Sequence, residues 1–187
     1  MAIFLIKNKF GEFKNIKPIK QDTQRSLIEN YGHHMQDEWR PIDFEWDTED
    51  GDKPRDIFLY LGHILIGNRG CIDALETLIN SSKCECLPIK IAQDEYYIIN
   101  VCDTLKGVLD RKKSKIEYFK DGSIKWIRNF AFCADCETSL IFHISEIASP
   151  IFATETFVQC VKNANLIGLQ FEECKYVRSN FLRNIFK

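Results

Sequence analysis

The 187-residue sequence has no run of about 18 apolar residues, the length that a membrane-spanning helix needs, so no transmembrane helix is predicted. The apolar stretch before Lys7 is short and lacks a small-residue cleavage site, so no signal peptide is expected. Low-complexity segments and internal repeats are lacking too. These absences predict an ordered protein of the cytoplasm.

Sequence signatures of catalysis are also missing. The chain contains no GxSxG, no P-loop and no glycine-rich phosphate loop, and none of its four histidines lies in HExxH or HxE spacing. His143 stands between Phe142 and Ile144 in a predicted strand, which favours a packed, hydrogen-bonded ring. A nucleophile assembled from distant positions, such as Cys102 with His143 and Asp103, would be the exception. We predict that the protein is not an enzyme and needs no cofactor.

Eight cysteines are present, and without a secretory signal they are expected to be reduced thiols packed as small hydrophobic side chains. Cys84 and Cys86 form a CxC, and Cys133 and Cys136 form a CxxC, so four thiolates could in principle bind zinc. A zinc ribbon uses two CxxC pairs, and the sequence does not bring these two pairs together. No metal site is therefore predicted, and these four cysteines are the candidates if one exists.

The clearest structural signal is the stretch 87–110. Leu87, Ile89 and Ile91 recur at the strand period of two, which predicts a strand with one buried face. Residues 96–102 are aromatic and β-branched, as is typical of a strand that is covered on both faces near the middle of a sheet. The two strands should form a hairpin around a polar turn at 93–95. Asn100 is the polar exception, and a buried amide needs hydrogen-bond partners.

The remaining elements predict an α+β protein. Further strands are expected at residues 2–6, 42–47, 57–61, 115–119, 124–132, 140–144 and 169–174, with a hairpin turn at Asp121-Gly122 and a chain break at 148–150. Helices are expected at 22–31, capped by Asp22 or Thr23, at 71–79, and at 155–165, with Thr154 as N-cap and Gly168 past its end. A short amphipathic segment at 181–186 closes the chain. This order predicts a mainly antiparallel sheet with two or three packed helices in a single domain, 1–187.

Negative charge is concentrated between residues 37 and 52. Eight acidic residues and one basic residue give this segment a net charge of −7, which leaves +5 for the rest of the chain. In 42–47 apolar residues alternate with carboxylates, which predicts an edge strand with an aromatic inner face. Aromatic anchors inside a charged rim are typical of protein interfaces, and the negative charge favours a basic protein partner over nucleic acid. The interface candidates are Trp39, Asp43, Phe44, Glu45, Trp46, Asp47, Glu49, Asp50 and Asp52. The alternatives are a solvated acidic loop and aromatic side chains that fill the core.

Several blocks of the sequence occur together in one known family. The pieces "KPRDIFLY", "LPIKIAQDEYYIINVCDTLKGVLD", "LIFHI" and "PIFATETFVQCVKNANLIGLQFEEC" resemble, in this order, immunity family eleven of bacterial polymorphic toxin systems. The correspondence covers about residues 50–175, and "EWRP" resembles a further block. The cysteine-rich loop from Cys133 to Cys136 departs from the family pattern.

The resemblance implies a small cytoplasmic protein that binds and neutralises a cognate toxin encoded nearby. It divides the chain into a more variable part at 1–50, a family-like core at 51–175 and a C-terminal segment at 176–187. The resemblance carries over no residue-level binding site and leaves the oligomeric state open. No membrane or nucleic-acid partner is expected. The alternatives are a small cysteine-dependent metal-binding regulator or enzyme, and a non-enzymatic subunit of a phage-encoded or phage-defence assembly.

Overall fold

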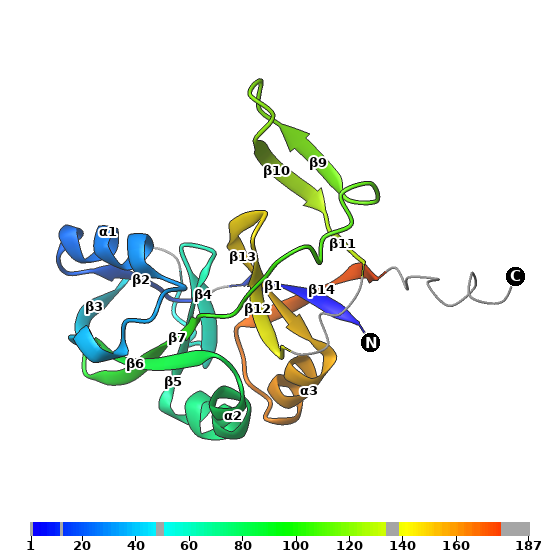
Figure 1. The fold of residues 1–187 in the computed structure, drawn as a ribbon. Coiled ribbons are helices and arrows are strands. Elements are labelled where there is room, and N and C mark those ends of the chain that lie inside the picture. The colour runs from blue at the N-terminus through cyan, green and yellow to red at the C-terminus, as the bar shows by residue number, and fades with distance from the viewer. Residues whose placement is uncertain (1, 12, 48–50, 134–138, 177–187) are drawn as a thin grey trace, which may run out of the picture.

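The structure is a computed structural model that describes residues 2–11, 13–47, 51–133 and 139–176 (Figure 1). Strands dominate these residues, and three α-helices accompany them. The strands form two six-stranded sheets and one separate two-stranded hairpin. The predicted segment at 181–186 lies outside the described residues.

The first sheet has the order β2-β3-β6-β7-β5-β4. Its strands are β2 (Asn15–Pro18), β3 (Ile42–Asp47), β4 (Ile57–Tyr60), β5 (Ile64–Asn68), β6 (Cys84–Ile91) and β7 (Asp94–Val101). β6 and β7 pair as an antiparallel hairpin, with Leu87 opposite Ile98, so the predicted hairpin is confirmed. β7 lies between β6 and β5, and residues 98–101 are all buried, as predicted for a central strand.

The prediction that residues 42–47 form an edge strand is wrong. β3 has two neighbours, because β2 pairs with it antiparallel and β6 pairs with it in parallel. The exposed carboxylates of β3 have basic neighbours on these strands, with Glu45 opposite Lys17 and Asp43 opposite Lys90. Charge on the outer face of this strand therefore reflects cross-strand pairing and not protection of an edge.

The second sheet has the order β11-β14-β1-β13-β12-β8. Its strands are β1 (Ile3–Asn8), β8 (Thr104–Leu105), β11 (Ala131–Phe132), β12 (Ile141–Ile144), β13 (Ile147–Thr154) and β14 (Leu169–Tyr176). The predicted break at 148–150 is wrong, because β13 runs through it. The pairing of β12 with β13 is irregular between Phe142 and Ile144, and an irregular stretch of this kind tolerates Pro150, which has no amide hydrogen to donate.

A third, two-stranded unit consists of β9 (Lys115–Tyr118) and β10 (Ile124–Asn129), which pair antiparallel around the predicted Asp121-Gly122 turn. Figure 1 shows that this hairpin stands away from both sheets. Its base is attached to the body because Ile127 is buried in a core cluster with Phe130, Phe132 and Phe152.

The helices are α1 (Gln21–Asn30), α2 (Arg69–Ser81) and α3 (Glu155–Asn163), with a 3-10 turn, η1 (Gln36–Glu38), between α1 and β3. The helix at α1 is confirmed, but it begins after Lys20, so the predicted caps Asp22 and Thr23 lie inside the helix. Asn68 caps α2 through a hydrogen bond from the Cys71 amide. Thr154 is the N-cap residue of α3, as predicted, but its hydroxyl donates to the carbonyl of Leu140 and makes no capping hydrogen bond.

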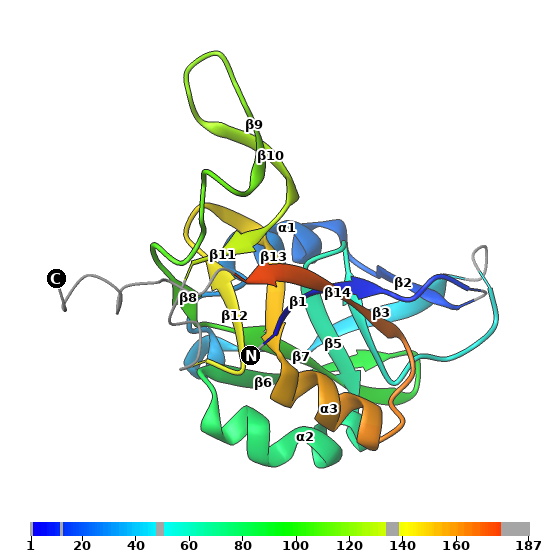
Figure 2. The same ribbon diagram turned by 90° about the vertical axis from the view of Figure 1, so that its right-hand side faces the viewer.

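The two large sheets share one core. Helices α2 and α3 lie side by side in Figures 1 and 2, and their buried residues Leu75 and Phe157 pack in one cluster with Ile99 of the first sheet and Ile151 of the second. The Asn8 side chain donates a hydrogen bond to the Leu59 carbonyl and accepts one from the Leu59 backbone amide, both at 2.7 Å. These two bonds join the second sheet to the edge strand β4 of the first.

The predicted fold class is met in part. Strands prevail and helices pack on them, but the sheets are mixed, because β3–β6, β8–β12 and β11–β14 pair in parallel. Among the described residues, no helix is long and apolar enough to cross a membrane.

Candidate functional site

A surface groove of about 860 Å³ lies beside the first sheet. Its walls come from α1, from the segment 34–40 that contains η1, and from the ends of β3 and β6. The residues lining it include Asn30, Met35, Asp37, Glu38, Trp39 and Arg40. The groove thus carries acidic, basic and aromatic side chains together.

One wall of this groove is held in place by a polar pair inside the sheet. Glu85 and Asn100 face each other across β6 and β7, and both are buried. The Asn100 Nδ2 donates to Glu85 Oε2 at 2.8 Å and to the His33 carbonyl at 2.7 Å, and its Oδ1 accepts from the Gly32 amide at 2.8 Å. The partners that a buried Asn100 was predicted to need are therefore found in the chain segment after α1.

Glu85 fixes the next residues of the same segment. Its Oε2 also accepts from the Met35 amide at 2.9 Å, and its Oε1 accepts from the Gln36 amide at 3.3 Å and lies 3.1 Å from His34 Nδ1. Burial by itself raises the pKa of Glu85, but the hydrogen bonds from Met35, Asn100, His34 and Gln36 outweigh it, so this pKa lies below its usual value. Glu85 is therefore a charged anchor at neutral pH.

Within the described part of the chain, one set of three potential ligand atoms lies together, on His34, Glu85 and Cys102. A carboxylate offers about four acceptor positions, and four donors already occupy those of Glu85. Burial and the charge of Glu85 raise the pKa of the Cys102 thiol to about 11, so it is protonated at neutral pH. These groups fit a hydrogen-bond network and not a metal site.

Three of the four cysteines singled out by their spacing, Cys84, Cys86 and Cys133, are described, and none of them belongs to a group of three potential metal ligands within the described residues. Cys84 and Cys86 lie on β6, where burial raises the pKa of both thiols, to about 12 for Cys84. The Cys133 thiol donates to the carbonyl of Val108 at 3.3 Å. Cys136 lies outside the described residues. The thiols of β6 are thus partly buried and protonated at neutral pH.

His143 is packed as its position in a strand predicted. It is 5% exposed, and its Nδ1 lies 3.0 Å from the carbonyl oxygen of Pro150. The Tyr31 ring meets it edge to face at 5.7 Å. Burial raises the pKa of Tyr31, so the phenol stays protonated in this core.

The aromatic interface candidates take different positions. Phe44 is 1% exposed and packs edge to face on Tyr60, so the core alternative holds for this side chain. Trp39 is half-buried, and its indole N–H donates to the Pro88 carbonyl at 2.9 Å. Trp46 is half-buried between Tyr96 and the Lys14 ammonium, which lies 5.6 Å from the ring centroid.

The acidic candidates are mostly at the surface. Asp43, Glu45 and Asp52 are exposed, and Asp47 is half-buried. Glu45 forms an exposed ion pair with Lys17 at 3.4 Å. Glu49 and Asp50 lie outside the described residues. The exposed carboxylates of β3 therefore sit among basic neighbours, and the surface is less uniformly acidic than the sequence predicts.

Sequence reasoning missed Glu85 as the residue that holds the groove wall. Glu85 precedes Leu87, Ile89 and Ile91 at the period of two, so the alternation that predicted a buried face also places this carboxylate on it. A charged residue on a buried face requires partners, and this signal could have identified it before the structure was known.

Comparison with protein-family models finds a match over residues 3–176 to the one described as Immunity protein family (Imm11). No curated protein matches the chain.

Proposed function

Because the chain belongs to the Immunity protein family (Imm11), we propose that it binds a cognate bacterial toxin and neutralises it by covering the toxin's active surface. The observation that carries this proposal is the family match, which extends over both large sheets and the hairpin. In this proposal the protein acts by binding in the cytoplasm and transforms no substrate of its own.

A protein that blocks by coverage needs a surface that keeps its shape. The segment 33–40 has this property, because Glu85 and Asn100 bind its backbone from inside the sheet and Trp39 is tied to Pro88. An interface of standard size buries about 1,600 Å² in total. The groove and the adjoining outer face of β3 offer rigid, charged and aromatic surface of the kind such interfaces use.

The proposal is tested by co-expression with the toxin domain encoded beside the gene for this chain. Growth should be rescued by the wild-type chain, and the purified pair should form a stable complex. A catalytically inactive toxin serves as the control that separates intoxication from the burden of expression. Absence of both rescue and complex would refute the proposed function.

We propose that the exposed carboxylates Asp43 and Glu45 contact a basic region of the toxin. Reversing both charges to lysine should slow association about tenfold at low salt and reduce the salt dependence, because charges at an interface act mainly on the association rate. The matched control reverses Glu76 and Glu173, which are also exposed but lie on α2 and β14. Equal association rates for the two double variants would place the contact elsewhere.

A further inference from the structure

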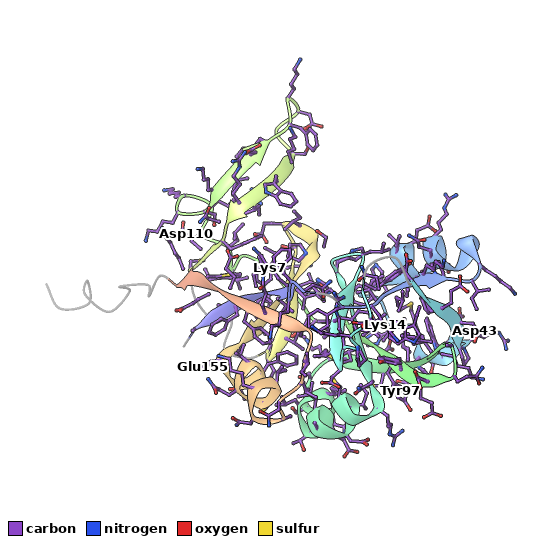
Figure 3. The ribbon with its side chains drawn as sticks, turned by 180° about the vertical axis from the view of Figure 1, so that it is seen from behind. Lys7, Lys14, Asp43, Tyr97, Asp110 and Glu155 are labelled. Carbon is purple, nitrogen blue, oxygen red and sulfur yellow. The ribbon has the colours of Figure 1, made fainter. Side chains whose placement is uncertain are left out.

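Charge is distributed unevenly along this chain. Residues 111–129, which form the β9–β10 hairpin with its flanks, contain seven basic and two acidic residues and carry +5. Segment 37–52 carries −7, and the remaining residues sum to zero. Figure 3 shows Asp110, at the base of the hairpin, and Asp43, on β3, on opposite sides of the molecule. The projecting hairpin with its flanks therefore carries a strong net positive charge within a short stretch of chain.

The hairpin also exposes aromatic side chains. In the described residues eight large hydrophobic side chains are exposed, and three of them, Tyr118, Phe119 and Trp126, belong to this hairpin. Their exposed fractions are 50%, 53% and 57%. Aromatic side chains are less favourable in water than polar ones, so three exposed rings on one projecting element indicate a surface that another molecule covers.

The hairpin is held in a defined shape without help from these three rings. Its inward side chains Ile116, Ile124 and Ile127 pack against the core of the second sheet. At the turn, Asp121 accepts hydrogen bonds from the amide and the hydroxyl of Ser123, at 2.9 and 2.6 Å. An element that is already ordered loses little conformational entropy when a partner binds it.

The chemistry of the hairpin identifies the kind of surface it would meet. Exposed aromatic residues surrounded by arginine and lysine are the side chains enriched at the centres of protein interfaces, and their positive charge complements acidic side chains. The carboxylates Glu117, paired with Arg128, and Asp121 lie among them and lower the net positive charge, and the family match on which the proposed function rests points to a protein as the partner. These features favour an acidic protein surface over nucleic acid.

We infer that the β9–β10 hairpin docks onto an acidic surface of the cognate toxin, with Phe119 and Trp126 as its apolar anchors. This inference rests on the proposed function. It adds a second contact of opposite charge to the one proposed at β3, so the toxin should be basic where it meets β3 and acidic where it meets the hairpin.

The first test removes the anchors. The double variant Phe119→Ala and Trp126→Ala should bind the inactivated toxin domain at least about 30-fold more weakly, the loss typical of central aromatic residues. Urea unfolding should be unchanged, because both rings are more than half exposed. The matched control is Phe10→Ala, since Phe10 is 87% exposed and lies outside the hairpin. Binding of this control should equal that of the wild type.

The second test reverses charge. Replacing Lys115, Lys120 and Lys125 by glutamate should slow association with the toxin about tenfold at low salt, and the difference should vanish at high salt. The control variant carries the same replacement at three exposed lysines elsewhere, Lys9, Lys20 and Lys175. Its association rate should stay close to that of the wild type.

The outcomes separate the two proposals. A wild-type chain that does not bind the toxin refutes the proposed function, and with it this inference. A wild-type chain that binds while both hairpin variants bind equally well refutes the inference alone. The same variants are examined by light scattering and by titration with a single-stranded oligonucleotide. If they lose self-association or oligonucleotide binding and keep toxin affinity, the hairpin serves a second copy or a nucleic acid, and the inference is wrong.

Discussion

Replacing Glu85 with glutamine should loosen the segment after α1 from the first sheet. The substitution keeps the size of the side chain and removes its charge at a position that is 7% exposed. In the native protein both carboxylate oxygens accept hydrogen bonds, and three of the donors, the amides of Met35 and Gln36 and the side-chain amide of Asn100, can only donate in this arrangement. A glutamine side chain has one accepting oxygen and one donating nitrogen, so it cannot satisfy all of them.

The loss of folding stability in Glu85→Gln follows from the hydrogen bonds that the glutamine side chain cannot make. The best placement of glutamine keeps its oxygen toward Met35 and Asn100 and turns its nitrogen toward His34, whose ring can accept in its other tautomer. The 3.3 Å hydrogen bond from the Gln36 amide is then lost, which costs about 1 kcal/mol. The two bonds that remain lose their charge assistance, at about 0.5–1 kcal/mol each. Glu85→Gln should therefore destabilise the protein by about 2–3 kcal/mol.

Urea unfolding of the purified protein measures the total effect, and amide hydrogen exchange shows where it acts. The amide of Met35 should exchange faster in Glu85→Gln than the loss of global stability explains, because its hydrogen bond to the carboxylate is weakened. The control is Glu76→Gln on α2, where the side chain is exposed and the stability change should stay within about 0.5 kcal/mol. If Glu85→Gln resembles this control and exchange at Met35 is unchanged, Glu85 does not hold the segment.

The pH dependence of Glu85 gives a second prediction. Its pKa is lowered in the folded state, so the stability that the charged carboxylate adds is complete above the usual glutamate pKa of about 4.3 and is lost as the pH falls through the lower folded value. The difference in unfolding free energy between the wild type and Glu85→Gln should therefore shrink in acid, and urea titrations at several pH values measure it. Gly168→Ala should cost at least about 2 kcal/mol in the same assay, because φ is +132° and an added Cβ would lie 2.1 Å from the Ile57 carbonyl oxygen; a change below 1 kcal/mol would contradict this close packing. Phe44→Ala should lower the free energy of unfolding by about 3–5 kcal/mol, because the ring fills the core. A Phe44→Ala variant with unchanged stability and weaker toxin binding would instead identify Phe44 as a surface anchor. The Cys84 thiol is half-buried and has its pKa raised to about 12, so it should react with a thiol reagent at pH 8 much more slowly than free cysteine does.

Local patterns in the sequence predicted most of the individual elements. The alternation in residues 87–91, the Asp121-Gly122 turn and the spacing of apolar residues in α2 each depend on neighbouring residues, and the structure contains the corresponding elements. The prediction of a chain break at 148–150 failed because proline is tolerated where strand pairing is irregular, and irregular pairing depends on the partner strand.

Sheet neighbours and burial could not be predicted in the same way. β3 pairs with β2 and β6, which are distant in the sequence, so its two-sided coverage and the burial of Phe44 are set by contacts that no local pattern encodes. The partnership of Glu85 with Asn100 depends on the register of a hairpin, and the bonds of both residues to the segment 32–36 depend on how the chain returns after α1.

The sequence by itself determined the strand and helix periodicities, the family and the total charge, because each is a property of residue order or composition. Only the tertiary structure decided that the basic hairpin projects from the body with three aromatic rings exposed, and that a buried carboxylate fixes the groove wall. The physical reason is that exposure and hydrogen-bond partnership depend on which distant segments meet, and these meetings are settled by packing of the whole chain.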